Sequence, residues 1–397
     1  MTNLTTLDKL HQHIAVLANV KESDSPFFSF YLNVGHEDGQ WRQVLDERAT
    51  TLRRILKGSH LSDFEESLEK VDLWLDTELL PNADSVAIFA RGSGGGQFML
   101  PMQFAAPLPN MVAVYPTPNI YHLVELKDNY HRYVVLLTLP DRASIFEVNL
   151  GVATTRAWLE YPELRERVGS EWSRSHYQVH QAHRGDRYLE EKLAILDKLM
   201  RAGGETHLIL AGDPQMTDKV LQELPVELQK KVIDRVPASQ RDQQSDVVLA
   251  TLSSFVEHEE QESQAIADAL VEGVRHQNLA VAGTAATLAA LQWGEVDTLV
   301  MESAYQPDPG WTCTACNALG TATPENPVCK KCDSSAVRPL DVKEALLRLA
   351  GKTDCSVEVV EHSTALQTLG GVGCLLRHSP DVDSRNDSVV VDRADRV

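Results

Sequence analysis

Four closely spaced cysteines constrain the fold of this chain more than any other feature of its sequence. Cys313 and Cys316 form one C-x2-C pair, and Cys329 and Cys332 form a second pair after a linker of twelve residues. Each pair offers two thiolates from one tight turn, and a linker of this length lets the two turns close a tetrahedron around one ion. The spacing therefore predicts a zinc ribbon over residues 311–335, with these four cysteines as the ligands.

The predicted zinc is structural. Four thiolates leave the metal no open position for water, so the site is not expected to catalyse a reaction. A disulfide framework is not expected in a chain predicted to be cytoplasmic. A redox or iron–sulfur role is the alternative for the same four cysteines.

Length and charge limit the remaining possibilities. A chain of 397 residues is expected to form two or three domains. The net charge of −20 argues against non-specific binding of nucleic acid, and DNA is not an expected partner, although a local basic face would still allow RNA binding in one orientation. The chain shows no signal-peptide pattern and no apolar run near the roughly 20 residues that span a bilayer. A soluble, cytoplasmic protein without membrane association is therefore expected.

The first predicted domain, residues 1–129, mixes helix and strand patterns. Residues 25–34 are typical of a buried strand, and residues 41–58 of a helix that stops at Gly58. Two apolar runs flank the glycine-rich stretch RGSGGG, which predicts a β-hairpin because glycine adopts positive φ at low cost. The tripeptide Gly95–Gln97 is thus expected in a turn, as a mobile tip.

The rest of the chain alternates strands and helices. Residues 130–255 are predicted as a middle domain that begins with three consecutive strands, and residues 256–378 as a C-terminal domain interrupted by the zinc ribbon. The acidic run at 256–264 is expected to open a long helix at that boundary. The predicted fold class is α/β and multidomain, with three α/β domains, mixed sheets and a zinc-ribbon insertion. Residues 379–397 are predicted to be a disordered acidic tail.

Several blocks of the sequence carry a family resemblance. Residues 280–303 read AVAGTAATLAALQWGEVDTLVMES and residues 369–378 read LGGVGCLLRH. Both resemble, in this order, segments of the C-terminal domain of archaeal and eukaryotic class I release factors and of Pelota, whose archaeal members carry a zinc ribbon between them. Residues 27–34, FFSFYLNV, resemble the opening strand of the bacterial relatives. The chain is therefore identified as a member of the bacterial branch of this family, most similar to the Balon-type ribosome hibernation factors.

The resemblance implies a place on the ribosome. Residues 1–129 would lie on the side of the decoding centre, and the middle domain would reach toward the peptidyl transferase centre. The implied partners are the A site of the 70S ribosome with its 16S and 23S ribosomal RNA, and elongation factor Tu as a GTPase held by the C-terminal domain.

The family's catalytic tripeptide is absent from its expected position. In these factors a Gly-Gly-Gln loop of the middle domain cuts peptidyl-tRNA, because glycines let the backbone enter the site and the next N–H stabilises the oxyanion. The corresponding residues, 160–187, contain no Gly-Gly-Gln, and Gln178 follows His176 and Tyr177. No catalytic residue is therefore predicted and the chain is not expected to be an enzyme, with residual hydrolysis around Gln178 as the alternative.

The same segment carries side chains suited to RNA, since cations bind phosphates and rings stack on bases. The predicted RNA contacts are Arg165, Arg167, Trp172, Arg174, His176, Tyr177, Gln178, His180, His183, Arg184 and Arg187, together with Arg91 beside the glycine-rich turn. A solvated amphipathic helix is the alternative, because acidic residues balance part of this charge. The pair His176 and His180 also suits metal ligation from one helix.

Three functions are consistent with these features. The favoured one is a ribosome-binding translation factor that occupies the A site as a non-catalytic hibernation or stalling factor under stress. The second is a peptidyl-tRNA-hydrolysing release or rescue factor that uses a divergent loop around Gln178. The third is a zinc-ribbon adaptor that binds other proteins and never enters the ribosome.

Overall fold

The chain divides into two compact units. The computed structural model describes residues 3–35, 40–139, 142–160, 193–201, 207–321, 328–353 and 355–377. One unit combines Met1–Asn129 with Glu260–Val397, and the other is Tyr130–Glu259. The division of the first unit into separate N-terminal and C-terminal domains at the predicted boundaries stays a prediction.

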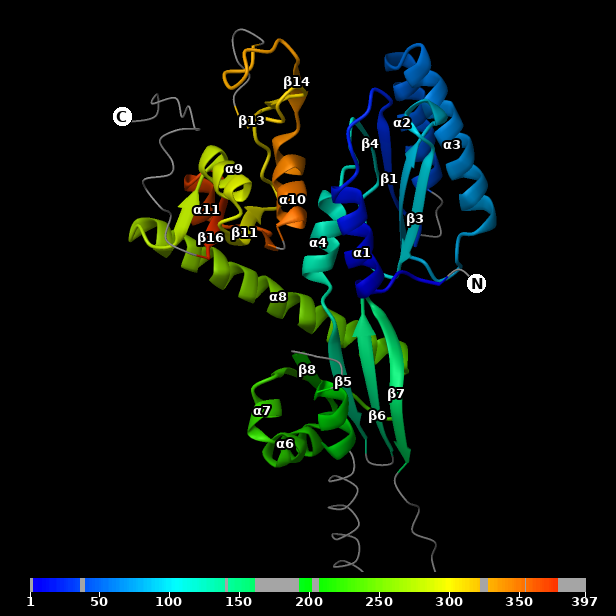
Figure 1. Ribbon diagram of the computed structural model, residues 1–397. Helices are drawn as coiled ribbons and strands as arrows, with labels where there is room; N and C mark the ends of the chain where they lie inside the picture. The colour runs from blue at the N-terminus through cyan, green and yellow to red at the C-terminus, as the bar shows by residue number, and fades with distance from the viewer. Residues whose placement is uncertain are drawn as a thin grey trace, which may run out of the picture. The chain divides into compact units, whose positions relative to one another are not determined.

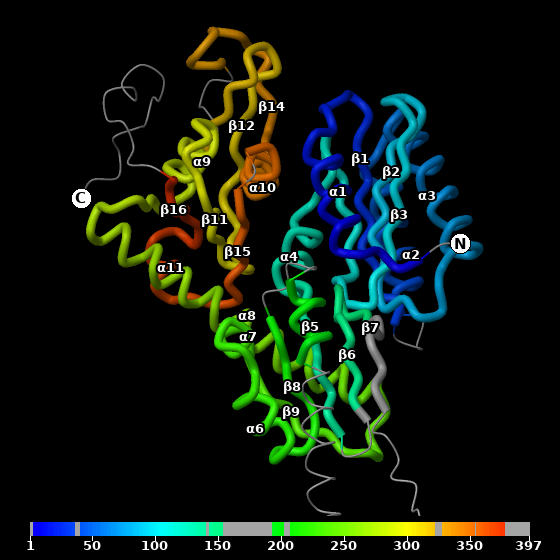
Figure 2. The backbone as a smooth tube through the Cα atoms, turned by 60° about the horizontal axis from the view of Figure 1, so that its bottom comes forward, coloured from blue at the N-terminus to red at the C-terminus, as the bar shows by residue number. Residues whose placement is uncertain are grey.

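An antiparallel sheet forms the N-terminal part of the first unit. Its strand order is β3 (Phe98–Phe104), β2 (Ser85–Arg91), β1 (Phe27–Asn33) and β4 (Met111–Tyr115). Four helices accompany it: α1 (Leu7–Ala18), α2 (Gln40–Ile55), α3 (Ser59–Thr77) and α4 (Tyr121–Asn129). In Figures 1 and 2, α2 and α3 cover one face of this sheet, and α1 and α4 lie on the other.

Both faces of β1 are buried, which explains its unbroken apolar sequence. Phe28 and Phe30 pack with Phe64 of α3 in one core cluster. Tyr31 points to the other face, where its ring lies 5.2 Å from that of His122 in α4. In a strand covered on both faces, an apolar residue at any position stabilises the fold by burying its surface. The alternation of apolar and polar residues that is typical of a half-exposed strand is therefore absent.

The predicted hairpin is confirmed, but its turn is not a free tip. β2 and β3 pair antiparallel around the short helix η1 (Ser93–Gly95). The Gly94 amide donates to the Asp63 carboxylate at 3.1 Å, and the Ser93 amide donates to Glu66 at 3.0 Å. Gly96 has a φ of +84°, a conformation that side chains rarely adopt. The expectation of a mobile tip is wrong because α3 supplies carboxylates that hold the backbone of the turn.

A mixed sheet forms the C-terminal part of the first unit. Its order is β10 (Ala280–Ala282), β16 (Val372–Leu376), β11 (Val296–Glu302) and β15 (Ser356–Val360). β11 and β15 are parallel, and β16 runs antiparallel to both β10 and β11. The accompanying helices are α9 (Thr284–Trp293), α10 (Val342–Lys352), α11 (Thr364–Thr368) and the last turns of α8 (Gln244–Arg275).

The second unit is built on a five-stranded mixed sheet. Its order is β7 (Val152–Glu160), β6 (Arg142–Asn149), β5 (Tyr133–Thr138), β8 (His207–Gly212) and β9 (Val232–Pro237). The three consecutive strands predicted at its start are confirmed as β5, β6 and β7, which pair antiparallel. Leu150 and Gly151 both have positive φ in the turn between β6 and β7, as a two-residue hairpin loop requires.

Helices cover both faces of this second sheet. Odd-numbered residues of β5 pack against α8, where the Tyr133 and Phe255 rings stack with centroids 4.5 Å apart. Even-numbered residues of β5 pack against α6 (Pro214–Glu223) and the helical residues 193–201. The short helix α7 (Val226–Gln229) adds Leu228 to the same cluster. Among the described residues, no helix is both long and apolar enough to cross a membrane.

The helix predicted to open at the acidic run begins twelve residues earlier. α8 spans 32 residues from Gln244 to Arg275, so residues 256–264 lie in its middle. Glutamate is a good helix former, and a run of it neither starts nor stops a helix. The acidic run therefore does not open α8, although the division between the two compact units, at Glu259 and Glu260, falls within it.

The α/β fold class is confirmed, with mixed sheets in two places. The N-terminal sheet differs, because all of its neighbouring strands are antiparallel. The short turn between β2 and β3 allows only an antiparallel pair, since a parallel pair needs a crossover of a dozen or more residues.

Truncation of one core ring should show how much the first unit depends on the packing of α3. Phe64 is fully buried, so Phe64→Ala should lower the free energy of unfolding by about 3–5 kcal/mol. Leu73 lies on the same helix with 64% of its surface exposed, and Leu73→Ala should change it by less than about 0.5 kcal/mol. Urea unfolding followed by circular dichroism measures both; equal losses would contradict the assigned core.

Candidate functional site

The four cysteines come together on a small ribbon within the first unit. Its strands, in the order β13 (Leu319–Gly320), β12 (Gly310–Cys313) and β14 (Val337–Leu340), lie close to α10 in Figure 1. The Sγ atoms of Cys313 and Cys332 are 3.6 Å apart, as are those of Cys316 and Cys329. All four Sγ atoms lie within 4.8 Å of one another.

Both C-x2-C pairs adopt the same turn. The Asn317 amide donates to the Cys313 carbonyl and the Asp333 amide to the Cys329 carbonyl, each at 2.8 Å. Asn317 and Asp333 directly follow the second cysteine of each pair and have φ values of 57° and 54°. Asparagine and aspartate tolerate this left-handed conformation better than other side chains, so the local sequence favours two equivalent turns.

The geometry fits one tetrahedral metal ion. Zinc with Zn–S bonds of about 2.3 Å holds its four sulfurs about 3.8 Å apart. The two sulfur separations of 3.6 Å are close to this value. Burial raises the pKa of the Cys329 thiol, but the N–H groups of Lys331 and Cys332 favour its thiolate and bring the pKa down to about 7. Although the Ser334 amide lowers it, contacts with the neighbouring thiols raise the pKa of Cys332 to about 12, so compatibility with a structural zinc ion rests on the arrangement of the four sulfurs.

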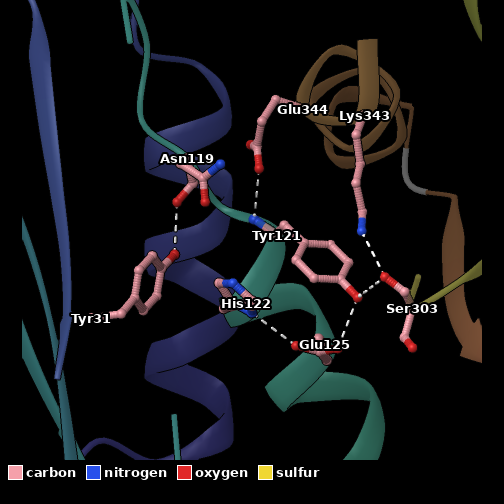
Figure 3. Close-up of polar contacts among 8 residues, drawn as sticks. All are labelled: Tyr31, Asn119, Tyr121, His122, Glu125, Ser303, Lys343 and Glu344. Carbon is pink, nitrogen blue, oxygen red and sulfur yellow. Dashed lines mark hydrogen bonds and ion pairs between the residues drawn. The ribbon is translucent and has the colours of Figure 1, made fainter. Parts of the chain in front are cut away.

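A second polar site joins α4 to α10, and the sequence analysis did not predict it. Figure 3 shows the Glu344 carboxylate of α10 directed at the first turn of α4. It accepts hydrogen bonds from the amides of Ile120 at 2.8 Å and Tyr121 at 3.1 Å. The first amides of a helix have no acceptor within the helix, so Glu344 supplies one from another element.

Neighbouring side chains complete this site. The Tyr121 hydroxyl donates to Glu125 at 2.8 Å, and the Lys343 ammonium lies 3.4 Å from the centroid of the Tyr121 ring (Figure 3). Lys343 also donates to the Ser303 carbonyl at 3.0 Å. These contacts tie α4 to the β11 end and to α10.

The sequence around Glu344 contains a helix-capping signal, but this signal does not reveal which helix Glu344 caps. Asp341 and Glu344 have the spacing of a capping box, and the Asp341 carboxylate accepts from the Glu344 amide at 3.2 Å. In a capping box the glutamate reaches back to its own helix. Here it caps α4 instead, more than 200 residues away along the chain.

The comparison with protein families identifies part of the chain. Residues 118–255 match the family model described as bacterial archaeo-eukaryotic release factor family 10. Over these residues the chain is similar to the bacterial archaeo-eukaryotic release factors. The predicted family is thereby confirmed at this level, and the likeness to Balon-type factors stays a prediction. No curated protein matches the sequence.

Solved structures resemble this release factor-like chain at low identity. An archaeal translation termination factor, aRF1, is 15% identical with a TM-score of 0.26, over 94% of this chain and 99% of that one. Archaeoglobus fulgidus Pelota is 12% identical with a TM-score of 0.36, over 95% of this chain and 93% of that one. Saccharomyces cerevisiae Dom34, a translation termination-like factor that interacts with Hbs1, is 11% identical with a TM-score of 0.39, over 79% and 94%.

Most of the predicted RNA contacts lie outside the described residues. This applies to all of those from Arg165 to Arg187, including Gln178, so their role stays a prediction. The edge strand β7 precedes the segment, and helical residues 193–201 follow it with Leu196 and Met200 buried in the core. Its two ends are therefore anchored in the release factor-like part of the chain.

Arg91 is the one predicted RNA contact with a described position. Its side chain donates to the carbonyls of Gly95 at 3.3 Å and Lys21 at 3.2 Å, and its guanidinium lies 4.7 Å from the centroid of the Phe27 ring. Only 8% of Arg91 is exposed, so binding a phosphate means giving up these contacts. Its contact with RNA stays a prediction.

Elemental analysis of the purified chain tests the metal centre. We expect one zinc ion per chain, and we expect Cys316→Ser to lose most of it because three thiolates hold zinc less tightly than four. Cys355→Ser is the control, since it removes a thiol outside the cluster and should leave the zinc content unchanged. Iron in place of zinc would support the iron–sulfur alternative, and a metal-free wild type would contradict both.

The buried Glu344 carboxyl predicts a pH dependence of stability. Burial raises its pKa from 4.5 to about 8, although the amides of Ile120 and Tyr121 lower it. The folded chain then keeps a proton that the unfolded chain releases above about pH 4.5, so its contribution is complete below that pH and is lost as the pH rises through about 8.

The variant Glu344→Gln removes this titration and keeps the shape of the side chain. Between about pH 5 and 8, wild-type stability should fall relative to the variant, with a limiting slope of about 1.4 kcal/mol per pH unit. Urea unfolding at several pH values measures the difference. Parallel pH profiles for the two proteins would show that Glu344 does not titrate in this way.

Proposed function

We propose that this release factor-like chain is a ribosome-binding translation factor that occupies the A site without cutting peptidyl-tRNA. In this proposal it acts as a hibernation or stalling factor under stress, and its partners are the 70S ribosome and its 16S and 23S ribosomal RNA. Elongation factor Tu is the GTPase proposed to bind the C-terminal residues 256–378. The four-cysteine ribbon would serve as a zinc-stabilised docking surface within that region.

One observation carries the proposal. Residues 118–255 match a release factor family, yet this part of the sequence contains no Gly-Gly-Gln. Water attack on the peptidyl ester needs glycines that let the backbone approach and an N–H that stabilises the oxyanion. A chain with the family's middle region but without these groups is suited to occupying the site and not to hydrolysis.

The tripeptide at Gly95–Gln97 does not replace the missing loop. A Cβ atom on Gly95 would lie 2.5 Å from the Cβ of Ser25 and 2.8 Å from the Cδ of Arg91, so this glycine is packed against its own fold. The turn is also bonded to α3 through Asp63. Gly95 therefore serves close packing and Gly96 a backbone φ of +84°, which accounts for both glycines without a catalytic role.

The charge of the chain suits such an occupant. A body with a net charge of −20 is repelled by exposed phosphates and binds RNA only where a basic segment faces them. The arginine- and histidine-rich residues 160–187 are the proposed segment. Acidic surfaces elsewhere would favour basic protein partners and fix one orientation.

Sedimentation and peptide release together test this function. We expect the tagged chain to travel with 70S particles from starved or cold-shocked cells, and purified chain to release no peptide from stalled ribosomes. Gln178→Ala should leave peptide release absent, because this glutamine does not activate water in the proposal, and should leave ribosome occupancy nearly unchanged, because it removes one of many proposed RNA contacts. The matched control Gln181→Ala should behave in the same way.

Two outcomes would overturn the proposal. Peptide release by the wild type that falls at least about a hundredfold in Gln178→Ala, but not in Gln181→Ala, would establish a rescue enzyme with a divergent loop. Absence from 70S particles in growing, starved and cold-shocked cells would favour the zinc-ribbon adaptor.

A further inference from the structure

A polar cavity of about 450 Å³, wide open to solvent, lies at one edge of the C-terminal sheet in the first unit. β10, β11 and β15 point the same way, because β10 and β11 both run antiparallel to β16 and β15 is parallel to β11. The cavity includes Glu302, the last residue of β11, and Thr284, the first residue of the helix that follows β10. Ligands of α/β sheets bind at such carboxyl ends, where loops leave the sheet.

Glu302 is a buried carboxylate with one oxygen still available. Only 3% of the residue is exposed. Its Oε1 atom is 3.2 Å from the Ser363 amide, 2.7 Å from Gln367 Nε2 and 3.3 Å from His362 Nδ1. Among the residues that the structure describes, no hydrogen-bond donor contacts Oε2. Glu302 lines the cavity, so its Oε2 atom can accept a hydrogen bond from a ligand or water that enters there.

The fold keeps space open beside this oxygen. Gly371 has a φ of +73°, and a Cβ atom at this position would lie 3.8 Å from Glu302 Oε2 and 3.2 Å from the Tyr305 ring. Burial raises the pKa of Tyr305 to about 12, so its hydroxyl stays protonated and donates to Thr284 Oγ1 at 3.0 Å. Tyr305 therefore holds the wall of the cavity without adding charge to it.

The charges around the cavity favour a cation. Its lining contains two carboxylates, Glu302 and Asp308, and no lysine or arginine. The amino end of α9 opposes them with the equivalent of only about half a positive charge. An anion would thus be repelled on balance, and a cation attracted.

The donor set favours a planar organic cation over a metal ion. Calcium takes six to eight oxygen ligands and magnesium about six, whereas Glu302 offers only one oxygen, because Oε1 already accepts two hydrogen bonds and lies 3.3 Å from His362 Nδ1. A guanidinium carries five N–H donors in one plane and can bond several acceptors at once. Gln367 uses its Nε2 atom for Glu302, so its oxygen remains an acceptor beside Gln306 and Asp308.

We propose that this cavity binds a guanidinium group, the side chain of an arginine on a partner protein or a small guanidinium compound. Glu302 Oε2 is the central acceptor, and Asp308 supplies the second negative charge. The site lies outside residues 118–255 and does not depend on the function proposed above.

Titration of the full-length chain with defined probes tests the site. The probes are acetyl-Gly-Arg-Gly-amide, its citrulline analogue, which is neutral, and agmatine; ligand-observed NMR measures their dissociation constants. The arginine peptide should bind saturably in the millimolar range and at least about tenfold more tightly than the citrulline peptide. Glu302→Gln should weaken it by at least about tenfold and Asp308→Asn, at an exposed position, by about threefold or more.

The control variant is Glu361→Gln, which removes an exposed carboxylate just beyond β15 but outside the cavity lining. It should change the affinity by less than about twofold. Tighter binding of the peptide than of agmatine assigns a protein partner, and equal or weaker binding of the peptide assigns a small guanidinium compound. Any of four results overturns the proposal: no saturable binding, equal binding of the citrulline peptide, equal losses in Glu302→Gln and Glu361→Gln, or displacement of the peptide by Mg²⁺ or Ca²⁺.

Discussion

The first unit depends on a carboxyl group that caps a helix belonging to another part of the chain. Glu344 accepts the leading amides of α4, and on the same interface Arg348 donates to the Val20 carbonyl at 2.6 Å and the Val359 amide to Asp128 at 2.6 Å. Each of these bonds satisfies a backbone group that burial would otherwise leave unpaired. The N-terminal and C-terminal stretches therefore form one compact unit even though Tyr130–Glu259 separates them in sequence. Such an interface is specific because these backbone groups find their partners only in this arrangement.

Hydrogen bonding of backbone groups also distinguishes a structural glycine turn from a catalytic one. The Gly-Gly-Gln at residues 95–97 has the same sequence as the catalytic tripeptide of release factors. Its turn, however, is hydrogen-bonded to Asp63 and Glu66 and packs against Ser25. Gly95 is needed there because a side chain would collide with Ser25 and Arg91, and Gly96 because side chains rarely adopt its φ of +84°. The functional proposal thus rests on the family match of residues 118–255 and on the missing tripeptide within them.

Much of the local structure could be read from patterns, and the failures have physical causes. The hairpin at β2 and β3, the three strands that open the second unit and the four-cysteine cluster were all predicted from spacing and periodicity. The start of α8 was not, because glutamate-rich segments continue a helix as readily as they begin one. The antiparallel pairing of β1 with β2 and β4 was missed because these strands are not joined by short turns, and a sequence pattern does not show which distant strands become neighbours.

The cysteine spacing and the left-handed residues Asn317 and Asp333 specify the two metal-binding turns locally, since every group involved lies within a few residues of its partner. The positions of strands such as β1 and β5 are likewise determined locally, because their apolar runs are stable only when they are buried. Tertiary structure alone decided that Glu344 caps α4, that Arg91 is enclosed by Lys21, Gly95 and Phe27, and that Glu302 keeps one oxygen for a cavity. These contacts join residues tens to hundreds of positions apart, and the burial that makes them strong exists only after the chain has folded.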